Sequence, residues 1–446
     1  MTGLLKRRRV PTRGSLYFLF FILAGTAATT LPVTAGENNV AIDAIINHPA
    51  VAVARARVCQ SASQYDVAVA RERPQVDFSL RGGTSLKSRF EQRDANSPHS
   101  RRFDDEDIDA VIGINQLLFD WGGVDASKRV ALSEQASNRI GLSLEIDRVA
   151  ADIIDLGIKL SEQQQRFDLF TQYKKDLAPH IRRIEAGVAV GVLRLSDLRS
   201  IKVIELDADI AITLAERQIA LLENELGQRF GLNPEDLAGL LATFRLRLPP
   251  VAPVIDSTNS REVMRIDQQI IAAEHEITRL KSERRPRLTT NIDTTLFDVD
   301  SYSQEYEITG ELQLTMPLYD GGSNQARRDE QDWRRRGLTN ERENTIRQHR
   351  NVSEATRRNI ERARDSIQSN EEKISALDDR LAEALARQGE TSGDVLSITS
   401  VREQLVSIHS EQISLSHQVE LGLLQGIFFA DALGDLLDLP HGGPQC

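Results

Sequence analysis

The sequence is poor in cysteine and in long apolar runs, and both shortages narrow the class of protein. Its 446 residues include 2 cysteines, Cys59 and Cys446, which are too few for a disulfide framework. Whether these two pair with each other stays open, because Cys446 ends a Gly-Pro tail. Beyond residue 35 no apolar run approaches the ~20 residues that a membrane-spanning helix needs.

Positive charge and catalytic patterns are scarce as well. The chain carries 55 Lys and Arg against 66 Asp and Glu, a formal net charge of −11, which argues against nucleic acid as a partner. No HExxH and no Ser-centred elbow occurs, and His409 and His417 lack a supporting pattern. We therefore predict no enzyme activity, no metal site and no cofactor.

What is present begins with an export signal. Basic residues from Lys6 to Arg13 precede the apolar stretch "LYFLFFILAGTAATTLPVTA", and the small residues Val33 and Ala35 suit a signal peptidase. We predict that residues 1–35 are a cleaved signal peptide, with an uncleaved anchor as the alternative. Cleavage removes five positive charges and takes the net charge from −11 to −16. An exported protein without a spanning helix is periplasmic, secreted, or crosses the outer membrane by strands.

The mature chain repeats one order of elements. Each half opens with a helical pattern, at 48–73 and 261–285, which a following proline ends. Asn259 and Glu262 resemble a capping box at the second helix. The predicted divisions are a first structural repeat at 36–240, a Pro-rich connector at 241–259, a second repeat at 260–437 and a tail at 438–446.

Beyond each helix the pattern changes to a period of two. In 306–318, Tyr306, Ile308, Leu312 and Leu314 fall on one face, and glutamates alternate with them. Weaker alternation predicts partner strands at 76–88, 108–115 and 287–297. Each half therefore contributes a hairpin with an apolar and a polar face. This pattern fits a soluble sheet packed against helices, or part of a transmembrane barrel.

A glycine pair ends each hairpin, and a very long helix is predicted after it. Each run of about 65 residues would span roughly 100 Å. A short Gly-containing break and a returning helix follow, and in 201–222 apolar residues recur at steps of three and four, which indicates a coiled-coil hairpin. Four strands are too few to close a barrel, but three copies would supply twelve.

The motifs then resemble those of a known family, the outer-membrane efflux proteins of the TolC type. "RPQVDFSLRGG", "LLFDWGG", "GVLRLSDL", "MPLYDGG" and "ALGDLL" occur in the family's order along nearly the whole mature chain. The resemblance implies a mainly helical protein with transmembrane β structure. In such a protein a homotrimer forms one 12-stranded β-barrel, which is continuous with an α-helical periplasmic tunnel, in the outer membrane of a Gram-negative bacterium.

Two sets of candidate site residues follow. At the strand-to-helix crossings, glycines allow a tight path and aspartates suit helix N-termini; the residues are Asp120, Gly122, Gly123, Asp320, Gly321 and Gly322. At the helical tips, the resemblance implies that an adaptor contacts Gly191, Val192, Leu193, Leu195, Gly389 and Gly393. It also makes Asp394, Asp197 and Ser397 candidates for the tunnel-entrance gate. Ser397 stands where the family's type member has a second aspartate, so a single acidic ring is expected, and for Asp394 a helix-capping role is equally open.

The predicted function is a passive exit duct for a tripartite efflux or type I secretion system. The resemblance implies a periplasmic adaptor (membrane fusion) protein, an inner-membrane pump or ABC exporter, and outer-membrane lipid as partners. A periplasmic adaptor or coiled-coil scaffold without a barrel is the alternative. The arginine-dense stretch 327–364 could line a channel for acidic cargo or form a solvated helix face.

Overall fold

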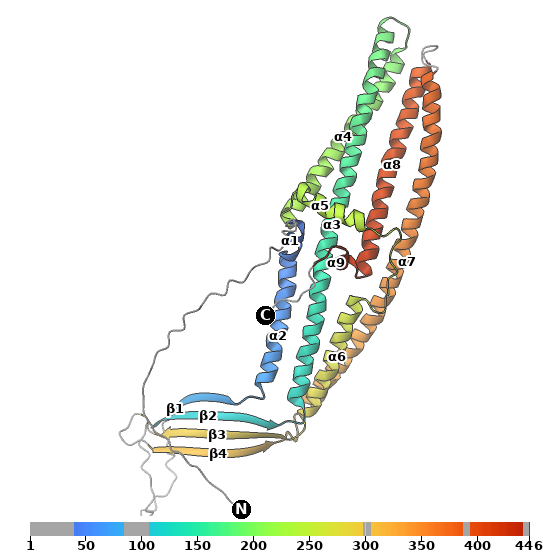
Figure 1. Ribbon diagram of the computed structural model, residues 1–446. Coiled ribbons are helices and arrows are strands. Elements are labelled where there is room, and N and C mark those ends of the chain that lie inside the picture. Colours follow the sequence, from blue (N-terminus) through green and yellow to red (C-terminus); the bar gives the residue numbers. More distant parts are fainter. Residues whose placement is uncertain (1–39, 84–106, 298, 300–304, 387–392, 440–445) are drawn as a thin grey trace, which may run out of the picture. The chain divides into compact units, whose positions relative to one another are not determined.

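The computed structural model describes residues 40–83, 107–297, 299, 305–386, 393–439 and 446, and the statements below concern these residues. They form helices and four strands (Figure 1), and the order found is that of the predicted repeats. The elements of the first repeat are α1 (Val40–Ile46), α2 (Pro49–Ala70), β1 (Gln75–Gly83), β2 (Asp107–Phe119), α3 (Gly123–Ala189), α4 (Leu195–Phe230) and α5 (Pro234–Arg247). Those of the second are α6 (Arg261–Ser282), β3 (Arg287–Phe297), β4 (Glu305–Thr315), α7 (Ser323–Ala386), α8 (Gly393–Phe429) and α9 (Leu433–Leu436).

The start of α6 differs from the prediction by one residue. Its N-cap is Ser260, whose hydroxyl accepts a hydrogen bond from the Val263 amide at 3.4 Å. Asn259, the predicted cap, instead donates from its side chain to Asp256 at 2.8 Å. Both residue types cap helices well, and here the turn around Asp256 has already engaged Asn259.

The four strands form one antiparallel sheet in the order β1-β2-β3-β4. The register places Val76 opposite Ile114, Ile114 opposite Ile292, and Leu288 opposite Leu314. Since neighbouring side chains on one strand point to opposite faces, this pairing gathers most of the apolar residues of the four strands on one face; Val111 and Leu117 of β2 lie on the other. The other face is polar, and across it the Asn115 amide donates to Asn291 at 2.7 Å.

The helices lie side by side in two stages (Figure 1). Next to the sheet, contacts join α2 to α3, α3 to α6, and α6 to α7. Farther along, they join α4 to α3, α3 to α8, and α8 to α7. The 67-residue α3 therefore runs through the interior of both stages, and it stays helical through Pro179. The open sides of the subunit are formed by α2 and α4 on one side and by α7 on the other.

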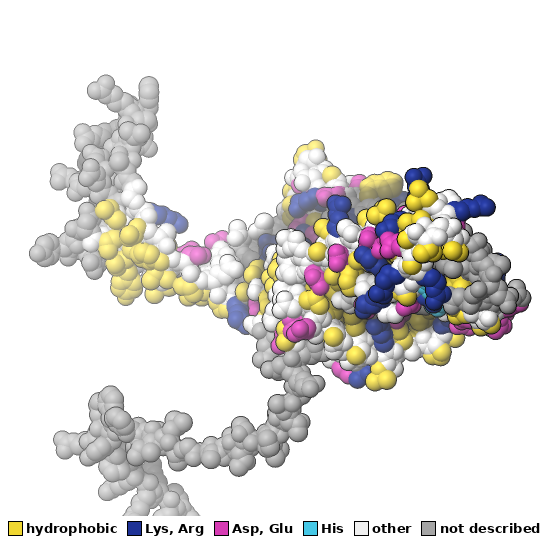
Figure 2. All heavy atoms as spheres, turned by 90° about the horizontal axis from the view of Figure 1, so that it is seen from above, with side chains coloured by type: hydrophobic (Ala, Val, Ile, Leu, Met, Phe, Trp, Pro, Cys, Tyr) yellow, Lys and Arg dark blue, Asp and Glu magenta, His cyan; other side chains and the backbone are white. Residues whose placement is uncertain are grey.

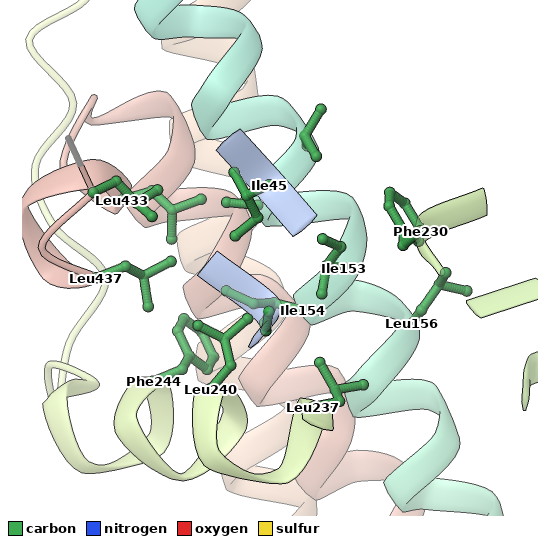
Figure 3. Packing of buried hydrophobic residues seen from close by; sticks show 14 of the residues in the cluster. Ile45, Ile153, Ile154, Leu156, Phe230, Leu237, Leu240, Phe244, Leu433 and Leu437 are labelled. Carbon is green, nitrogen blue, oxygen red and sulfur yellow. The ribbon is translucent and has the colours of Figure 1, made fainter. Parts of the chain in front are cut away.

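The main apolar core lies where the short helices pack on α3. Phe244, Leu240 and Leu237 of α5 face Ile154 of α3 in a cluster that also includes residues of α1 and α9 (Figure 3). The close approach requires a small residue on α3, since a Cβ at Gly157 would come within 2.8 Å of Leu237. The predicted connector 241–259 thus begins inside a helix.

The sequence does contain the pattern of a helix at α5, although we predicted a connector over its last residues, from 241 onward. Asn233 and Pro234 suit the cap and the first position of a helix, and apolar residues follow at steps of three and four. The residues of this pattern are Leu237, Leu240, Leu241 and Phe244, all of which are buried.

Two further findings concern covalent structure and membrane spans. Cys59 of α2 and Cys446 form a disulfide bond, which ties the last residue of the chain to α2. The sequence had left this pairing open. Across the described ranges, no helix is both long enough and apolar enough to cross a membrane.

Candidate functional site

The apolar face of the sheet is exposed in the single subunit. Phe78, Leu80, Ile308 and Leu312 are each between 62% and 69% exposed, and Tyr306 is 73% exposed. Figure 2 shows hydrophobic side chains gathered in this region of the molecule. A soluble sheet would bury such a face against its own helices. A contiguous apolar face of this kind indicates a partner, either protein or membrane.

At the crossing from β2 to α3, Asp120 closes the helix start. Its carboxylate accepts hydrogen bonds from the amides of Gly122 at 3.1 Å and Val124 at 2.6 Å. At the crossing from β4 to α7, Asp320 accepts from Gly322 at 3.0 Å and Asn324 at 2.8 Å. Each carboxylate therefore satisfies helix amides that have no partner within the helix. These hydrogen bonds lower the pKa of Asp320, with the amide of Asn324 as the largest cause.

Each crossing contains two consecutive residues with positive φ. These residues show that the two Gly-Gly pairs of the sequence are not equivalent to each other, but are offset by one position. In the second crossing they are Gly321 (φ 68°) and Gly322 (φ 87°). In the first they are Trp121 (φ 61°) and Gly122 (φ 81°). Gly122 is thus equivalent to Gly322, and a bulky tryptophan takes the left-handed conformation that glycine takes in the other repeat.

Gly123 serves a different purpose from the other crossing glycines. It is the first residue of α3, equivalent to Ser323 of α7. A Cβ on Gly123 would lie 2.4 Å from the Ser282 hydroxyl oxygen and 2.8 Å from a carboxylate oxygen of Asp120. This glycine is needed because α6 approaches the helix start closely.

The first helical tip is a tight turn between α3 and α4. Gly191 has φ 76°, and Val192 is 73% exposed. Leu193 packs against Gly187, while Leu195 is exposed at the start of α4. These residues form an accessible end of the hairpin with one inward leucine.

The gate candidate Asp197 takes part in the cap of α4. Its carboxylate accepts a hydrogen bond from the backbone amide of Arg194 at 3.3 Å and from the Ser196 hydroxyl at 3.2 Å. A carboxylate at this position also suits the positive end of the helix dipole.

The second tip is described in part. Gly389 lies outside the described residues, and α8 begins at Gly393, so Asp394 stands in its first turn. Ser397 lies one turn further and is exposed. Both tips lie at the end of the long helices away from the sheet (Figure 1), so the tip residues are far from Asp120 and Asp320.

A buried charge cluster in the middle of the bundle was not expected from the sequence. The Arg261 guanidinium pairs with Asp147 at 2.8 Å, and the Arg261 amide donates to Asp431 at 2.6 Å. Beside it, His349 Nε2 lies 3.4 Å from Glu262. Burial raises the pKa of Asp431, while the His349 hydrogen bond lowers that of Glu262. The cluster joins α3, α6 and α7 to the residues that follow α8.

The arginine-dense stretch 327–364 makes several ion pairs. Arg342 reaches Asp267 of α6 at 2.6 Å, and Arg336 reaches Asp332 within α7 at 2.9 Å. The described residues contain no group of three or more His, Cys, Asp or Glu side chains that could hold a metal.

The comparisons with known proteins agree with this geometry. Residues 40–231, most of the first repeat, match the family described as Outer membrane efflux protein. The fold is similar to that of VceC from Vibrio cholerae, with a TM-score of 0.71 and 15% identity over 88% of this chain and 95% of that chain. A membrane protein from Pseudomonas aeruginosa gives 0.73 and 14% over 89% and 92%.

A third structure is in its open state. The MtrE outer membrane channel of Neisseria gonorrhoeae gives a TM-score of 0.66 and 12% identity over 88% of both chains. No curated protein sequence matches this one. The resemblance to the outer-membrane efflux proteins and the mainly helical fold class are thereby confirmed.

Proposed function

From the match of the first repeat to the outer membrane efflux proteins, and from a fold shared with outer-membrane channels, we propose that three copies of this chain form a passive exit duct. The observation that carries the proposal is the four-stranded sheet with one exposed apolar face and one polar face. Four strands cannot close on themselves, whereas twelve strands from three copies make a barrel with the apolar face toward lipid.

The subunit has two sides on which its outermost elements lack a neighbour, and these sides are the same for the sheet and for the helices. β1 and β4 are the edges of the sheet, α2 and α4 form one open side of the helical part, and α7 forms the other. A cyclic assembly joins unlike sides, so β1 of one copy meets β4 of the next while α4 meets α7. One symmetry operation therefore closes the barrel and the tunnel together.

An exposed apolar stripe on α4 supports this closure. Val203, Leu206, Ile210 and Leu214 recur at steps of three and four and are between 56% and 60% exposed. They lie outside the set of α4 residues that packs on α3, which includes Ile201 and the small residues that follow it. A neighbouring copy would bury this stripe along the tunnel wall.

The helical tips are the proposed contact with a periplasmic adaptor. Val190 and Val192 are more than 70% exposed at the first tip, as expected of residues that a partner covers. The adaptor would splay the coiled coils, while an inner-membrane pump or ABC exporter supplies the energy for efflux or type I secretion. Asp394 is the proposed gate, because three carboxylates brought together around an axis repel one another and attract cations.

The decisive experiment measures mass and membrane association. Light scattering of the detergent-extracted mature protein should give three copies per particle, and carbonate washing should leave the protein in the outer membrane. A soluble monomer without detergent, or release by carbonate, would instead favour the periplasmic adaptor or scaffold.

The gate needs a separate test in planar bilayers. Asp394→Ala should change the conductance of the channel and weaken its preference for cations, since it removes the ring of carboxylates that attracts them. Asp379→Ala, a change of an exposed aspartate on α7, is the matched control and should conduct like the wild type. Equal conductance of all three proteins would remove Asp394 from the gate.

A further inference from the structure

A basic hollow lies where the polar face of the sheet meets the helices. It has a volume of about 680 Å³, and its walls come from the ends of all four strands and from α3 and α6. The strand residues that line it, among them Gln75, Asn115, Thr289 and Gln313, all belong to the polar face. The hollow therefore opens on the side opposite the exposed apolar residues.

Arginines dominate the charge of this hollow. Five line it: Arg71, Arg73, Arg279, Arg285 and Arg287. Arg279 is engaged by Glu276 at 2.7 Å and by Glu283 at 2.5 Å. Within the described part of the chain, the other four make no ion pair with a carboxylate.

The acidic groups in the walls are already occupied. Asp120 accepts from two helix amides, and Glu283 is shared between Arg279 and Arg327, the latter at 3.5 Å. Four guanidinium groups thus remain available in a hollow whose two carboxylates have partners. Such a group offers a planar fork of donors that matches carboxylate, phosphate or sulfonate oxygens.

The strained residue of the first crossing orients one of these arginines. The Arg285 guanidinium lies 5.5 Å from the centre of the Trp121 ring, a cation–π contact, and Trp121 packs edge to face on Phe119. The equivalent position in the second repeat is Gly321, which offers no ring. The left-handed conformation of Trp121 costs about 1–2 kcal/mol, and a cost of this kind often marks a functional position.

We infer that this hollow binds an anionic group of the transported solute, with Arg285 and Arg287 as the principal donors. This inference rests on the proposed duct, in which the polar face lines the lumen. Three subunits would then place a ring of arginines at the neck between barrel and tunnel. The volume is that of a site for a drug-sized molecule, so the class of cargo is a soluble organic acid or organophosphate.

A lipid headgroup also carries a phosphate, but the position of the hollow disfavours lipid as its ligand. Lipid would contact the apolar face of the sheet, whereas the hollow opens on the other face. The two sources can nevertheless be separated by competition.

The test uses pyrenetetrasulfonate, a soluble fluorescent polyanion, and the detergent-extracted trimer. Binding is followed by fluorescence anisotropy and is compared among wild type, R285Q/R287Q, R285K/R287K and the control R182Q/R183Q. The control removes two exposed arginines near the end of α3 that lies away from the sheet. Inorganic pyrophosphate and dihexanoyl phosphatidylglycerol below its micelle concentration serve as competitors.

The inference requires at least about tenfold weaker binding by R285Q/R287Q, with less than twofold change in the control. The lysine variant should fall between them, because it keeps the charge and loses the fork. Equal binding by R285Q/R287Q and the wild type in a confirmed trimer would overturn the inference and leave the duct intact. Competition by the lipid alone would also overturn it. A preparation that light scattering shows to be monomeric would refute the duct itself.

Discussion

The long helices α3 and α7 occupy equivalent places in the two repeats and yet differ in what they bury. Buried apolar residues continue along α3 from Val124 to Ile184. The buried residues of α7 are mostly polar, namely Asn324, His349, Thr356 and Asn370 together with Ile360 and Ala363. A duplicated architecture has therefore kept its backbone while the surroundings of the two copies diverged.

The position of each helix in the subunit explains the difference. α3 touches α2, α4, α5, α6, α8 and α9, whereas the main neighbours of α7 are α6 and α8. With two main neighbours, most of the α7 surface is exposed in the single subunit, and polar residues are the stable choice there. Ion pairs one turn apart, such as Arg358 with Glu354, support the helix along this surface.

The largest expected contrast comes from truncating one residue on each helix. Ile153→Ala removes a fully buried side chain of α3 and should lower the free energy of unfolding by about 3 kcal/mol. Arg358→Ala on α7 removes an exposed, ion-paired side chain and should change it by less than about 0.5 kcal/mol. Circular dichroism during thermal unfolding in detergent measures both. Similar losses would mean that α7 is as tightly packed as α3.

The sequence was sufficient for features that depend on local pattern. Period-two alternation located the strands, and the apolar face at Tyr306, Ile308 and Leu312 was assigned correctly because strand geometry fixes which residues share a face. Helical patterns of more than sixty residues likewise predicted α3 and α7. The acidic residue before each glycine pair could be placed at a helix start for the same local reason.

Features that depend on tertiary contact could not be predicted. The pairing of Cys59 with Cys446 joins residues at a sequence separation of 387, and no local pattern specifies it. The basic hollow combines arginines after α2 with others around α6, which only the sheet brings together. The buried pair of Arg261 and Asp147 is a similar case.

The two crossings provide the next contrast. Gly123→Ala should cost about 2 kcal/mol, because the new Cβ would lie 2.4 Å from the Ser282 hydroxyl oxygen and 2.8 Å from the Asp120 carboxylate, and would displace both side chains from their hydrogen bonds. Ser323→Ala at the equivalent position of α7 should cost less than about 0.5 kcal/mol. Chemical denaturation in detergent would report both values. An equal tolerance of the two changes would show that the helix packing at the first crossing relaxes freely.

Two glycines in the second repeat should respond to alanine with opposite signs. Gly321→Ala introduces a Cβ at φ 68° and should lower the free energy of unfolding by about 1 kcal/mol. Gly337→Ala lies within α7 with open space around it, and should raise the same quantity by about 0.5–1 kcal/mol. Melting temperatures that move in the same direction for both variants would contradict the assigned backbone conformations.

The smallest effect concerns the pH dependence of the second crossing. Amide hydrogen bonds, first that of Asn324, hold the pKa of Asp320 below its ordinary value in an unfolded chain, so its contribution to stability is fully present above that ordinary pKa. As the pH falls through the lowered pKa, the carboxylate is protonated in both states and the contribution disappears. Asp320→Asn should therefore be less stable than the wild type at pH 7, and the difference should shrink toward pH 2. The control Asp378→Asn, at an exposed position of α7, should track the wild type throughout, and a pH-independent deficit in Asp320→Asn would show that the side-chain shape matters more than its charge.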